Sequence, residues 1–433
     1  MPTTAMKWAI AGIVAAGLGV PVSAAIGVSE VQACFAGQSA CAADPCSGAE
    51  SVLRALRCTA RLAHLTVRDE AARLGVGTQR PVGPIRNAAE LAEAFRTATP
   101  GQTLRLAPGR YDRVMLANRR FGTGGLTITS ADPANPATMT GMTLRTAEGV
   151  TLRNLAFDAS APGERYGLLV NGTKHVALDR LRFVDRRGVQ AAQVAVMLRN
   201  SQDLSMTRSD FYGFHNGVSL LDVERVRVEY NVFEAMLSDG IRGGGVSHTL
   251  IRGNACHGFT PVPKAHPDCI QLWTKRQTTP ASHITIRDNL VVRGNGGPVQ
   301  GVFITSADAK MLHSIDIAGN LIVGGMYNGI SVAYAGNVQV RENEVIGYPD
   351  QKSWIRVDRT QGAKMSGNRA SDYIIRDNEG LAREGDRTVA TRQRQAGERI
   401  AAWIAARSDD AELTARLKPI GQIGGKSETA ARP

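Results

Sequence analysis

The sequence predicts an all-β fold, a right-handed parallel β-helix solenoid with an N-terminal helical cap and a helical C-terminal extension. Three observations favour this class. A segment pattern recurs along most of the chain, asparagine returns at one position of that pattern, and glycine is frequent (46 of 433 residues) while aromatic residues are few (5%). Many short strands joined by turns suit such a composition better than a few large helices do.

The column that carries the recurring asparagine indicates how the coils stack. Its members are Leu155, Leu181, Ser209, Asn231, Asn254, Asn289, Asn320, Asn343 and Asn368, at intervals of 22 to 35 residues. The shorter intervals suit one coil of three short strands. Six successive Asn residues at one turn predict a ladder in which each side chain bonds to the backbone and to the next Asn.

A second column marks the start of a strand in five coils. The segments begin at Asn216, Asp239, Asp268, Gln300 and Asn328. Alternation then directs Val218, Ile241, Ile270, Val302 and Ile330 to the core, and Ser219, Arg242, Gln271, Phe303 and Ser331 to the outer face. Because stacked strands lie roughly 4.8 Å apart, we expect Arg242 beside Gln271.

Composition and pattern divide the chain into four segments. Residues 1–25 are typical of a secretory signal peptide, with Lys7 before a short apolar run and small residues; an uncleaved N-terminal anchor is the alternative. Residues 26–84 form a cysteine-bearing helical segment and linker, 85–378 the β-helix, and 379–433 a helical C-terminal extension with a disordered tail. We expect a periplasmic or secreted protein with no stable membrane insertion after signal cleavage.

The cysteines fall into two groups. Cys34, Cys41, Cys46 and Cys58 follow the signal closely. In an exported protein they favour two disulfides, with three possible connectivities, over a metal site. The repeat alignment directs Cys256 to the core and Cys269 outward, which favours two separate thiols over a disulfide.

Both ends of the β-helix carry helical patterns. An amphipathic helix is expected after Asn87, with Leu91 and Phe95 on one face, where it would cover the open end of the first coil. In the C-terminal segment, Trp403 and Ile404 are the expected packing residues of helices that cap or lie against the last coils.

Residues 85–160, including that helix and the stretch ITSADPANPATMTG (128–141), resemble the N-terminal cap of right-handed β-helix polysaccharide lyases such as alginate lyases and chondroitinase B. With the repeats, the chain resembles the pectate lyase-like superfamily of polysaccharide lyases and uronate epimerases. The resemblance implies carbohydrate chemistry.

The formal net charge of +12 also favours an acidic polysaccharide as partner, although a basic surface that is merely solvated is the alternative. No Lys/Arg-rich run of the nucleic-acid type occurs, so we expect no nucleic-acid partner, and we expect a monomer.

The candidate working surface runs from Asp239 to Lys275 and is centred on KAHPDCIQLW (264–273). The longest interval of the repeat falls here, and insertions in a solenoid form loops that often lie on the binding face. The chemistry-bearing residues are His257, Lys264, His266, Asp268, Gln271, Trp273 and Lys275, with Asp239 and Arg242 from the preceding coil.

Elimination or C5 epimerisation of a uronate needs a cation for the carboxylate, a base near C5 and a proton donor. We expect His266, Asp268, Arg242 and Lys264 to be catalytic. Arg242 or Lys275 would neutralise the carboxylate, His266 or Lys264 would be the base, and Asp268 would orient His266. The expected substrate-binding residues are Gln271, Trp273, Lys275, Asp239 and His257, with Trp273 stacking on a sugar ring. The motif HPDCIQ is similar to His-x-Asp motifs of some carbohydrate-active members of the superfamily.

Two other functions stay open at this point. Asp239 and Asp268 would serve a glycoside hydrolase as paired carboxylates. A non-catalytic glycan-binding or envelope structural protein would use the same residues only for contact or turn capping. No cofactor is expected; Asp239 and Asp268 could contribute to a Ca²⁺ site, but no set of six oxygen ligands is evident.

Overall fold

The computed structural model describes residues 83–159, 163, 165–277, 279–390 and 396–423. The expected signal peptide, the four clustered cysteines and the end of the C-terminal tail lie outside the described residues. Every described helix and strand belongs to one compact unit, which begins at Gly83. In the described part of the chain, no helix has both the length and the apolar character needed to cross a membrane.

The first described helix, α4 (Ala88–Thr97), begins the unit as predicted. Its N-cap residue Asn87 accepts a hydrogen bond from the Glu90 backbone N–H (2.9 Å) and donates one to the Glu90 carboxylate (2.7 Å). This reciprocal pair satisfies polar groups that the first helical turn leaves open. Leu91 and Phe95 are buried in the main core, so the predicted apolar face is confirmed.

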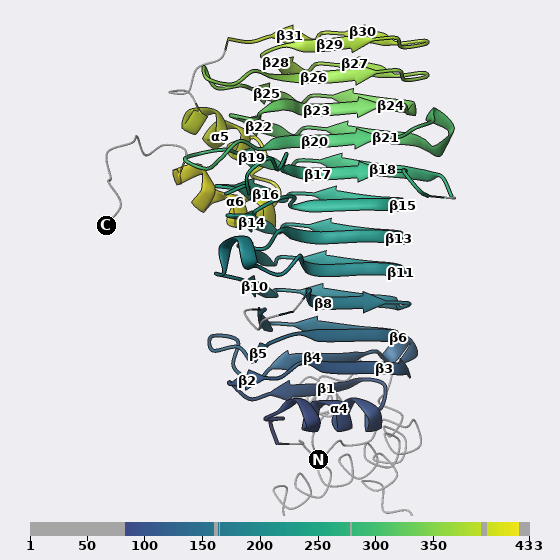
Figure 1. Cartoon of the computed structure of the whole chain (residues 1–433), viewed down its shortest axis with the longest axis vertical. Coiled ribbons are helices and arrows are strands. Elements are labelled where there is room, and N and C mark those ends of the chain that lie inside the picture. Colours follow the sequence, from purple (N-terminus) through teal and green to yellow (C-terminus); the bar gives the residue numbers. More distant parts are fainter. Residues whose placement is uncertain (1–82, 160–162, 164, 278, 391–395, 424–433) are drawn as a thin grey trace, which may run out of the picture. The chain divides into compact units, whose positions relative to one another are not determined.

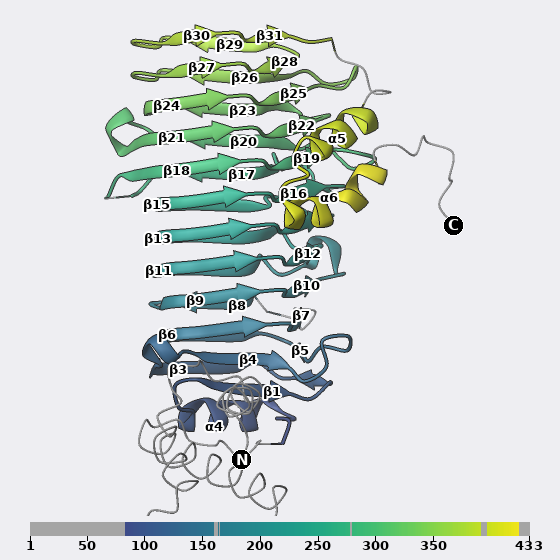
Figure 2. The ribbon, with the colours of Figure 1, turned by 180° about the vertical axis from the view of Figure 1, so that it is seen from behind.

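The strands confirm the predicted right-handed parallel β-helix (Figures 1 and 2). Each coil contributes to three faces. The first face consists of β3 (Val114–Arg120), β8 (Tyr166–Asn171), β17 (Asp268–Trp273), β20 (Gln300–Thr305), β23 (Tyr327–Ala333), β26 (Ser353–Asp358), β29 (Tyr373–Arg376) and the first halves of β6 (Met142–Arg153), β11 (Val194–Thr207), β13 (Asn216–Glu229) and β15 (Ile241–Arg252).

The second face continues after a bend. It contains the second halves of those four long strands together with β1 (Gln102–Leu106), β4 (Leu126–Ser130), β9 (Lys174–Asp179), β18 (Ala281–Arg287), β21 (Leu312–Ala318), β24 (Gly336–Arg341), β27 (Lys364–Ser366) and β30 (Ala382–Glu384). The turns carry short 3-10 helices at Gly122–Gly124, Gly188–Gln190 and Ala309–Met311.

The third face is a separate sheet, of 12 strands in the described residues. It consists of β2 (Arg110–Tyr111), β5 (Thr138–Met139), β7 (Ala156–Asp158), β10 (Arg182–Val184), β12 (Asp210–Tyr212), β14 (Val232–Glu234), β16 (Ala255–His257), β19 (Leu290–Val292), β22 (Leu321–Val323), β25 (Glu344–Ile346), β28 (Arg369–Ala370) and β31 (Arg387–Thr388). β30 and β31 continue the coils beyond residue 378, where the sequence pattern fades.

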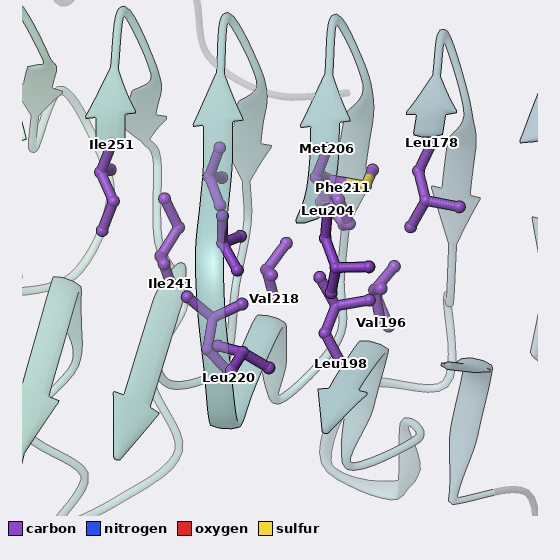
Figure 3. Close-up of a cluster of buried hydrophobic side chains, with 14 of the residues drawn as sticks. Leu178, Val196, Leu198, Leu204, Met206, Phe211, Val218, Leu220, Ile241 and Ile251 are labelled. Atoms are coloured by element: carbon purple, nitrogen blue, oxygen red, sulfur yellow. The ribbon is translucent and has the colours of Figure 1, made fainter. Parts of the chain in front are cut away.

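The register of the first face agrees with the predicted alternation. Arg242 lies opposite Gln271, and the predicted core residues Val218, Ile241, Ile270, Val302 and Ile330 are all buried. Arg242, Gln271 and Phe303 are half-buried on the outer side, whereas Ser219 and Ser331 are covered. Figure 3 shows how successive coils fill the interior, with Val196, Leu198, Val218, Leu220 and Ile241 among the clustered side chains.

The predicted asparagine ladder is present at the bend before the third face. Asn289 is representative: its Oδ1 accepts from the backbone N and Nδ2 of Asn254 (both 3.0 Å), and its Nδ2 donates to Asn320 Oδ1 (2.9 Å) and to the Ile251 carbonyl (3.0 Å). The same pattern links Asn231, Asn254, Asn289, Asn320, Asn343 and Asn368, and it ends at Asp386. Each buried amide therefore satisfies backbone groups at the turn of the preceding coil and bonds to the Asn side chain of the next coil.

The expectation of two separate thiols is wrong: Cys256 and Cys269 form a disulfide, with Cα atoms 5.7 Å apart, and both are buried. The alignment failed because strict inward–outward alternation begins only at Ile270, where β17 starts to pair with β15. Cys269 occupies a corner position that is glycine in the other four coils, and a Cβ added to Gly240 would lie 3.0 Å from Cys256 Sγ. That position therefore points inward, toward the third face.

Helices α5 (Ala396–Ala405) and α6 (Ala411–Ile423) pack on the outer side of the third face (Figure 2). Trp403 and Ile404 are buried there as predicted, and Trp403 Nε1 donates to the Gly319 carbonyl (3.0 Å). The helices share a core with β16, β19 and β22, so they cover middle coils and not the last ones.

Replacing Asn289 with Ala should lower the free energy of unfolding by about 3 kcal/mol or more. Several buried partners would each lack a hydrogen bond, at about 1–3 kcal/mol apiece. Urea unfolding followed by circular dichroism measures the change. Gln339→Ala, which removes an exposed amide from β24, is the matched control and should change stability little. Equal stability of the two variants would contradict the ladder's importance.

Candidate functional site

A column of polar side chains lines the start of the first-face strands. It consists of Asn216, Asp239, Asp268, Gln300 and Asn328, and we call it the polar column. All but Asn328 are buried. Two neighbouring pairs are connected directly: the Asp268 backbone N donates to Asp239 Oδ1 (3.1 Å), and Asn328 Nδ2 donates to Gln300 Oε1 (2.5 Å). The column therefore has a structural task at the corner of each coil.

Arg242 is the cation that the polar column holds in place. Its Nη1 lies 3.1 Å from Asp239 Oδ2 and donates to Asn216 Oδ1 at 3.1 Å. Its guanidinium carbon lies 5.0 Å from the centre of the Trp273 ring, in a cation–π contact. The Arg242 side chain nevertheless stays 33% exposed. A guanidinium fixed on one side and open on the other is arranged to receive a carboxylate.

Asp268 is the most deeply buried carboxyl group of the column, at 1% exposure. Its Oδ2 accepts from Gln271 Nε2 (2.8 Å), while its Oδ1 has no hydrogen-bond partner within the described part of the chain. Burial, reinforced by the nearby charge of Asp239, raises the pKa of Asp268 well above its usual range. The unpartnered oxygen is consistent with a protonated, neutral acid.

Asp239 is the carboxyl group that ionises first. Burial raises the pKa of Asp239 as well, but the Asp268 backbone N–H and the Arg242 guanidinium oppose that rise. Two adjacent carboxyl groups in a buried site do not both ionise readily, because their charges repel. We therefore assign the negative charge to Asp239, paired with Arg242, and the proton to Asp268.

Neither carboxyl group reaches the surface, which determines what each can do. A group that exchanges a proton with a substrate must touch it. Asp239 and Asp268 instead touch Arg242 and Gln271, whose side chains are partly exposed above them. The two acids are thus placed to act as positioning residues for the groups that face outward.

The structure does not bring all predicted site residues together. Lys264 and His266 are exposed on the inserted loop, residues 258–267, and Lys275 is exposed after β17. Among the described residues, no hydrogen bond or ion pair ties these three to Arg242 or Asp268. The Asp268 side chain bonds to Gln271 and not to His266. His257 is buried on the third face, in β16, where burial lowers its pKa.

The inserted loop is nevertheless attached to its surroundings. The Cys256–Cys269 disulfide joins its two flanking strands, β16 and β17. The backbone N of Val262 donates to the Leu237 carbonyl of the preceding coil (3.2 Å). From the following coil, Gly297 N donates to the Phe259 carbonyl (2.7 Å). Lys264 and His266 are therefore carried on a segment anchored beside the start of β17.

Two features of this face escaped the sequence-based predictions. Asn216 was recognised as a member of the column but not as a partner of Arg242. Tyr327 and Trp354 form an aromatic pair with ring centroids 5.5 Å apart. Extending the second column by one coil, into SWIRVD, would have found Trp354. As for metals, no three His, Cys, Asp or Glu side chains in the described ranges gather closely enough to hold an ion.

Comparisons with known proteins bear on the fold. The family model described as "Right handed beta helix region" matches residues 166–345. No curated protein matches the chain. Similar solved structures include an alginate lyase from Paenibacillus sp. str. FPU-7, at 16% identity over 71% of this chain and 99% of that chain, with a TM-score of 0.40.

Two further solved structures are similar to the chain. The A-module of mannuronan C-5 epimerase AlgE6 from Azotobacter vinelandii is 14% identical over 70% of this chain and 94% of its own, with a TM-score of 0.47. The surface adhesin PfbA of Streptococcus pneumoniae is 12% identical over 70% of this chain and 88% of its own, with a TM-score of 0.43. Similarity at this level concerns the fold alone.

Replacing Asp268 with Asn should change how stability depends on pH. The folded-state pKa of Asp268 is raised, so the folded protein holds a proton that the unfolded chain releases above the ordinary pKa of aspartate, about 3.9. The wild type should therefore lose stability relative to the variant as pH rises from that value toward the folded-state pKa, by up to about 1.4 kcal/mol per pH unit.

Urea unfolding of both proteins at a series of pH values from about 4 to 8 measures this difference. Asp112→Asn, at an exposed carboxylate, is the matched control. A constant stability difference between wild type and Asp268→Asn across the series would show that Asp268 has an ordinary pKa.

Proposed function

We propose that the outer side of the first face, around β15 and β17, binds an acidic polysaccharide and converts it at a uronate by β-elimination or C5 epimerisation. The observation that carries the proposal is Arg242, which is locked by Asp239 and Asn216, lies against Trp273 and stays partly exposed. A uronate offers a carboxylate for the guanidinium and a ring face for the indole.

The chemistry requires removal of the proton at C5 of the uronate. Arg242 would neutralise the carboxylate and so stabilise the negative charge that develops as the proton leaves. His266 or Lys264, on the anchored loop, would take that proton. In elimination the C4–O bond then breaks and the leaving oxygen receives a proton; in epimerisation C5 receives a proton on the opposite face of the ring.

Asp268 enters this mechanism as a positioning residue. It holds the Gln271 amide, which lies next to Arg242 in register and is free to contact sugar hydroxyl groups with its own oxygen. Lys275, exposed after β17, would add positive charge for a neighbouring uronate. His257 lies on the third face, so any contribution would come through the base of the inserted loop.

Charge and disulfide chemistry support the wider setting. A net charge of +12 favours association with a polyanion. The Cys256–Cys269 disulfide is typical of proteins that function in an oxidising compartment, which supports a periplasmic or secreted location.

Of the alternatives, hydrolysis by paired carboxylates has less support, because Asp239 and Asp268 are both buried beneath other side chains. Non-catalytic glycan binding is the second candidate. It is favoured because the groups in direct contact around Arg242 are suited to holding a sugar. In the described residues, no hydrogen bond or ion pair connects the proposed bases to these groups.

Incubation with alginate, pectate and glucuronan tests the proposal, read out by absorbance of unsaturated uronate and by NMR of the C5 proton. His266→Ala or Lys264→Ala should lower kcat by about 10²–10⁴-fold for whichever residue is the base. Arg242→Gln should lower kcat/KM by about 10²–10³-fold. Arg120→Gln, at an exposed arginine of β3, is the matched control and should leave both constants unchanged.

Three results would contradict parts of this proposal. Binding without turnover that survives His266→Ala and Lys264→Ala but not Arg242→Gln would establish the non-catalytic alternative. Reducing ends released without an unsaturated product would indicate hydrolysis. Full activity in Arg242→Gln would exclude this face as the site.

A further inference from the structure

We infer that the first face carries a second uronate-binding subsite, formed by Tyr327, Trp354 and Arg356, several coils from Arg242. This inference rests on the proposed function and extends it. The subsite would hold a distant sugar of the same polysaccharide chain, so that the protein would select long acidic chains over short ones.

The aromatic pair is the first component. Tyr327 opens β23 and is 46% exposed, and its ring is tilted by 35° against that of the half-buried Trp354, with the centroids 5.5 Å apart. The indole Nε1 of Trp354 donates to Asn328 Oδ1 (3.1 Å) in the polar column. Because this bond fixes the indole plane, the pair is a preformed platform of the kind that stacks on sugar rings.

The backbone conformation at Tyr327 determines where its ring lies. Its φ of +47° lies in the left-handed region, and the register with β26 shifts between Asn328 and Ile330. A bulky residue in that region costs on the order of 1–3 kcal/mol. The equivalent residues of the flanking coils, Val299 and Ser353, do not adopt a positive φ. The chain also adopts this conformation at Tyr230 and Tyr334, and at Tyr327 it leaves the ring exposed.

Arg356 supplies the charge. It lies on the outer side of β26, two residues after Trp354, with a side chain that is 32% exposed. The buried carboxylate of Asp358 accepts from Arg356 Nε (3.1 Å) and also forms an ion pair with Arg359 (3.3 Å). Arg359 also pairs with Asp377 (3.3 Å), whereas Asp358 is the one carboxylate paired with Arg356 in the described residues. The exposed third of the Arg356 side chain is therefore the part open to an anionic ligand.

This arrangement repeats the construction around Arg242. In both places a buried aspartate holds an arginine that is about one third exposed. Arg242 contacts Trp273 directly, and Trp354 precedes Arg356 by two residues on the same side of β26. The register connects them along one outer row, Arg242, Gln271, Phe303, Ser331 and Arg356. Four steps of roughly 4.8 Å separate the two arginines by roughly 19 Å. An oligosaccharide running parallel to the helix axis spans that distance.

Affinity as a function of chain length tests the inference. The probes are size-fractionated oligouronates from alginate and from polygalacturonate, with cello-oligosaccharides of equal length as neutral probes, and calorimetry with the full chain gives Kd. Wild type should bind the acidic probes more tightly once they are long enough to reach both subsites. Trp354→Ala and Arg356→Gln should each raise the Kd of the long acidic probes at least tenfold. Both variants should leave the Kd of the shortest probe unchanged.

Two further variants control for effects on folding. Tyr212→Ala removes an exposed aromatic residue that lies beside Arg186 on the third face, and it should leave every Kd unchanged. Tyr327→Gly should weaken binding of long probes yet raise the melting temperature, because glycine relieves the left-handed strain. A purely structural Tyr327 would give a lower melting temperature instead.

The outcomes separate the two levels of inference. If binding depends on chain length in Trp354→Ala and Arg356→Gln as strongly as in Tyr212→Ala, the second subsite is overturned. The proposed function is unaffected by that result. Equal affinity for neutral probes would overturn its preference for uronates. If wild type binds no oligouronate of any length, the proposed function fails and the subsite fails with it.

Discussion

The parallel backbone ladder between coils is the constraint on which the other features depend. Each strand bonds to the equivalent strand of the next coil, so residues that are 18 to 35 positions apart become neighbours. Side chains of one kind then form columns. The Asn column satisfies buried polar groups at one bend, from Asn231 to Asn368, and the polar column does the same at the start of the first face. A regular scaffold thus places the side chains of the candidate site on rigid strands.

The polar column links stability to the proposed binding. A buried carboxyl group is costly unless it is neutral or paired. Asp239 is paired with Arg242, and Asp268, whose pKa is raised, is bonded to Gln271. Each acid thereby fixes an outward side chain. Asp358 does the same for Arg356 further along the face. Binding groups held in this way lose little conformational freedom when a ligand arrives.

Much of the fold could be predicted because the columns are visible in the sequence as periodic patterns. The Asn ladder, the core-facing residues and the pairing of Arg242 with Gln271 all result from that periodicity. Cys269 could not be placed, because residues at a corner do not follow strand alternation. The partner of Asp268 could not be named either, because the path of the inserted loop, which carries His266, has no repeat to define it. The periodic pattern therefore does not predict the local geometry of corners and loops.

A crystal structure of the full chain with a long oligouronate tests the central claim most directly. We expect the sugar chain to lie along the first face, parallel to the helix axis, with one carboxylate at roughly 2.7–2.9 Å from Arg242 and its ring against Trp273. A sugar chain bound on the second or third face, or one whose carboxylates make no contact with Arg242, would contradict that claim.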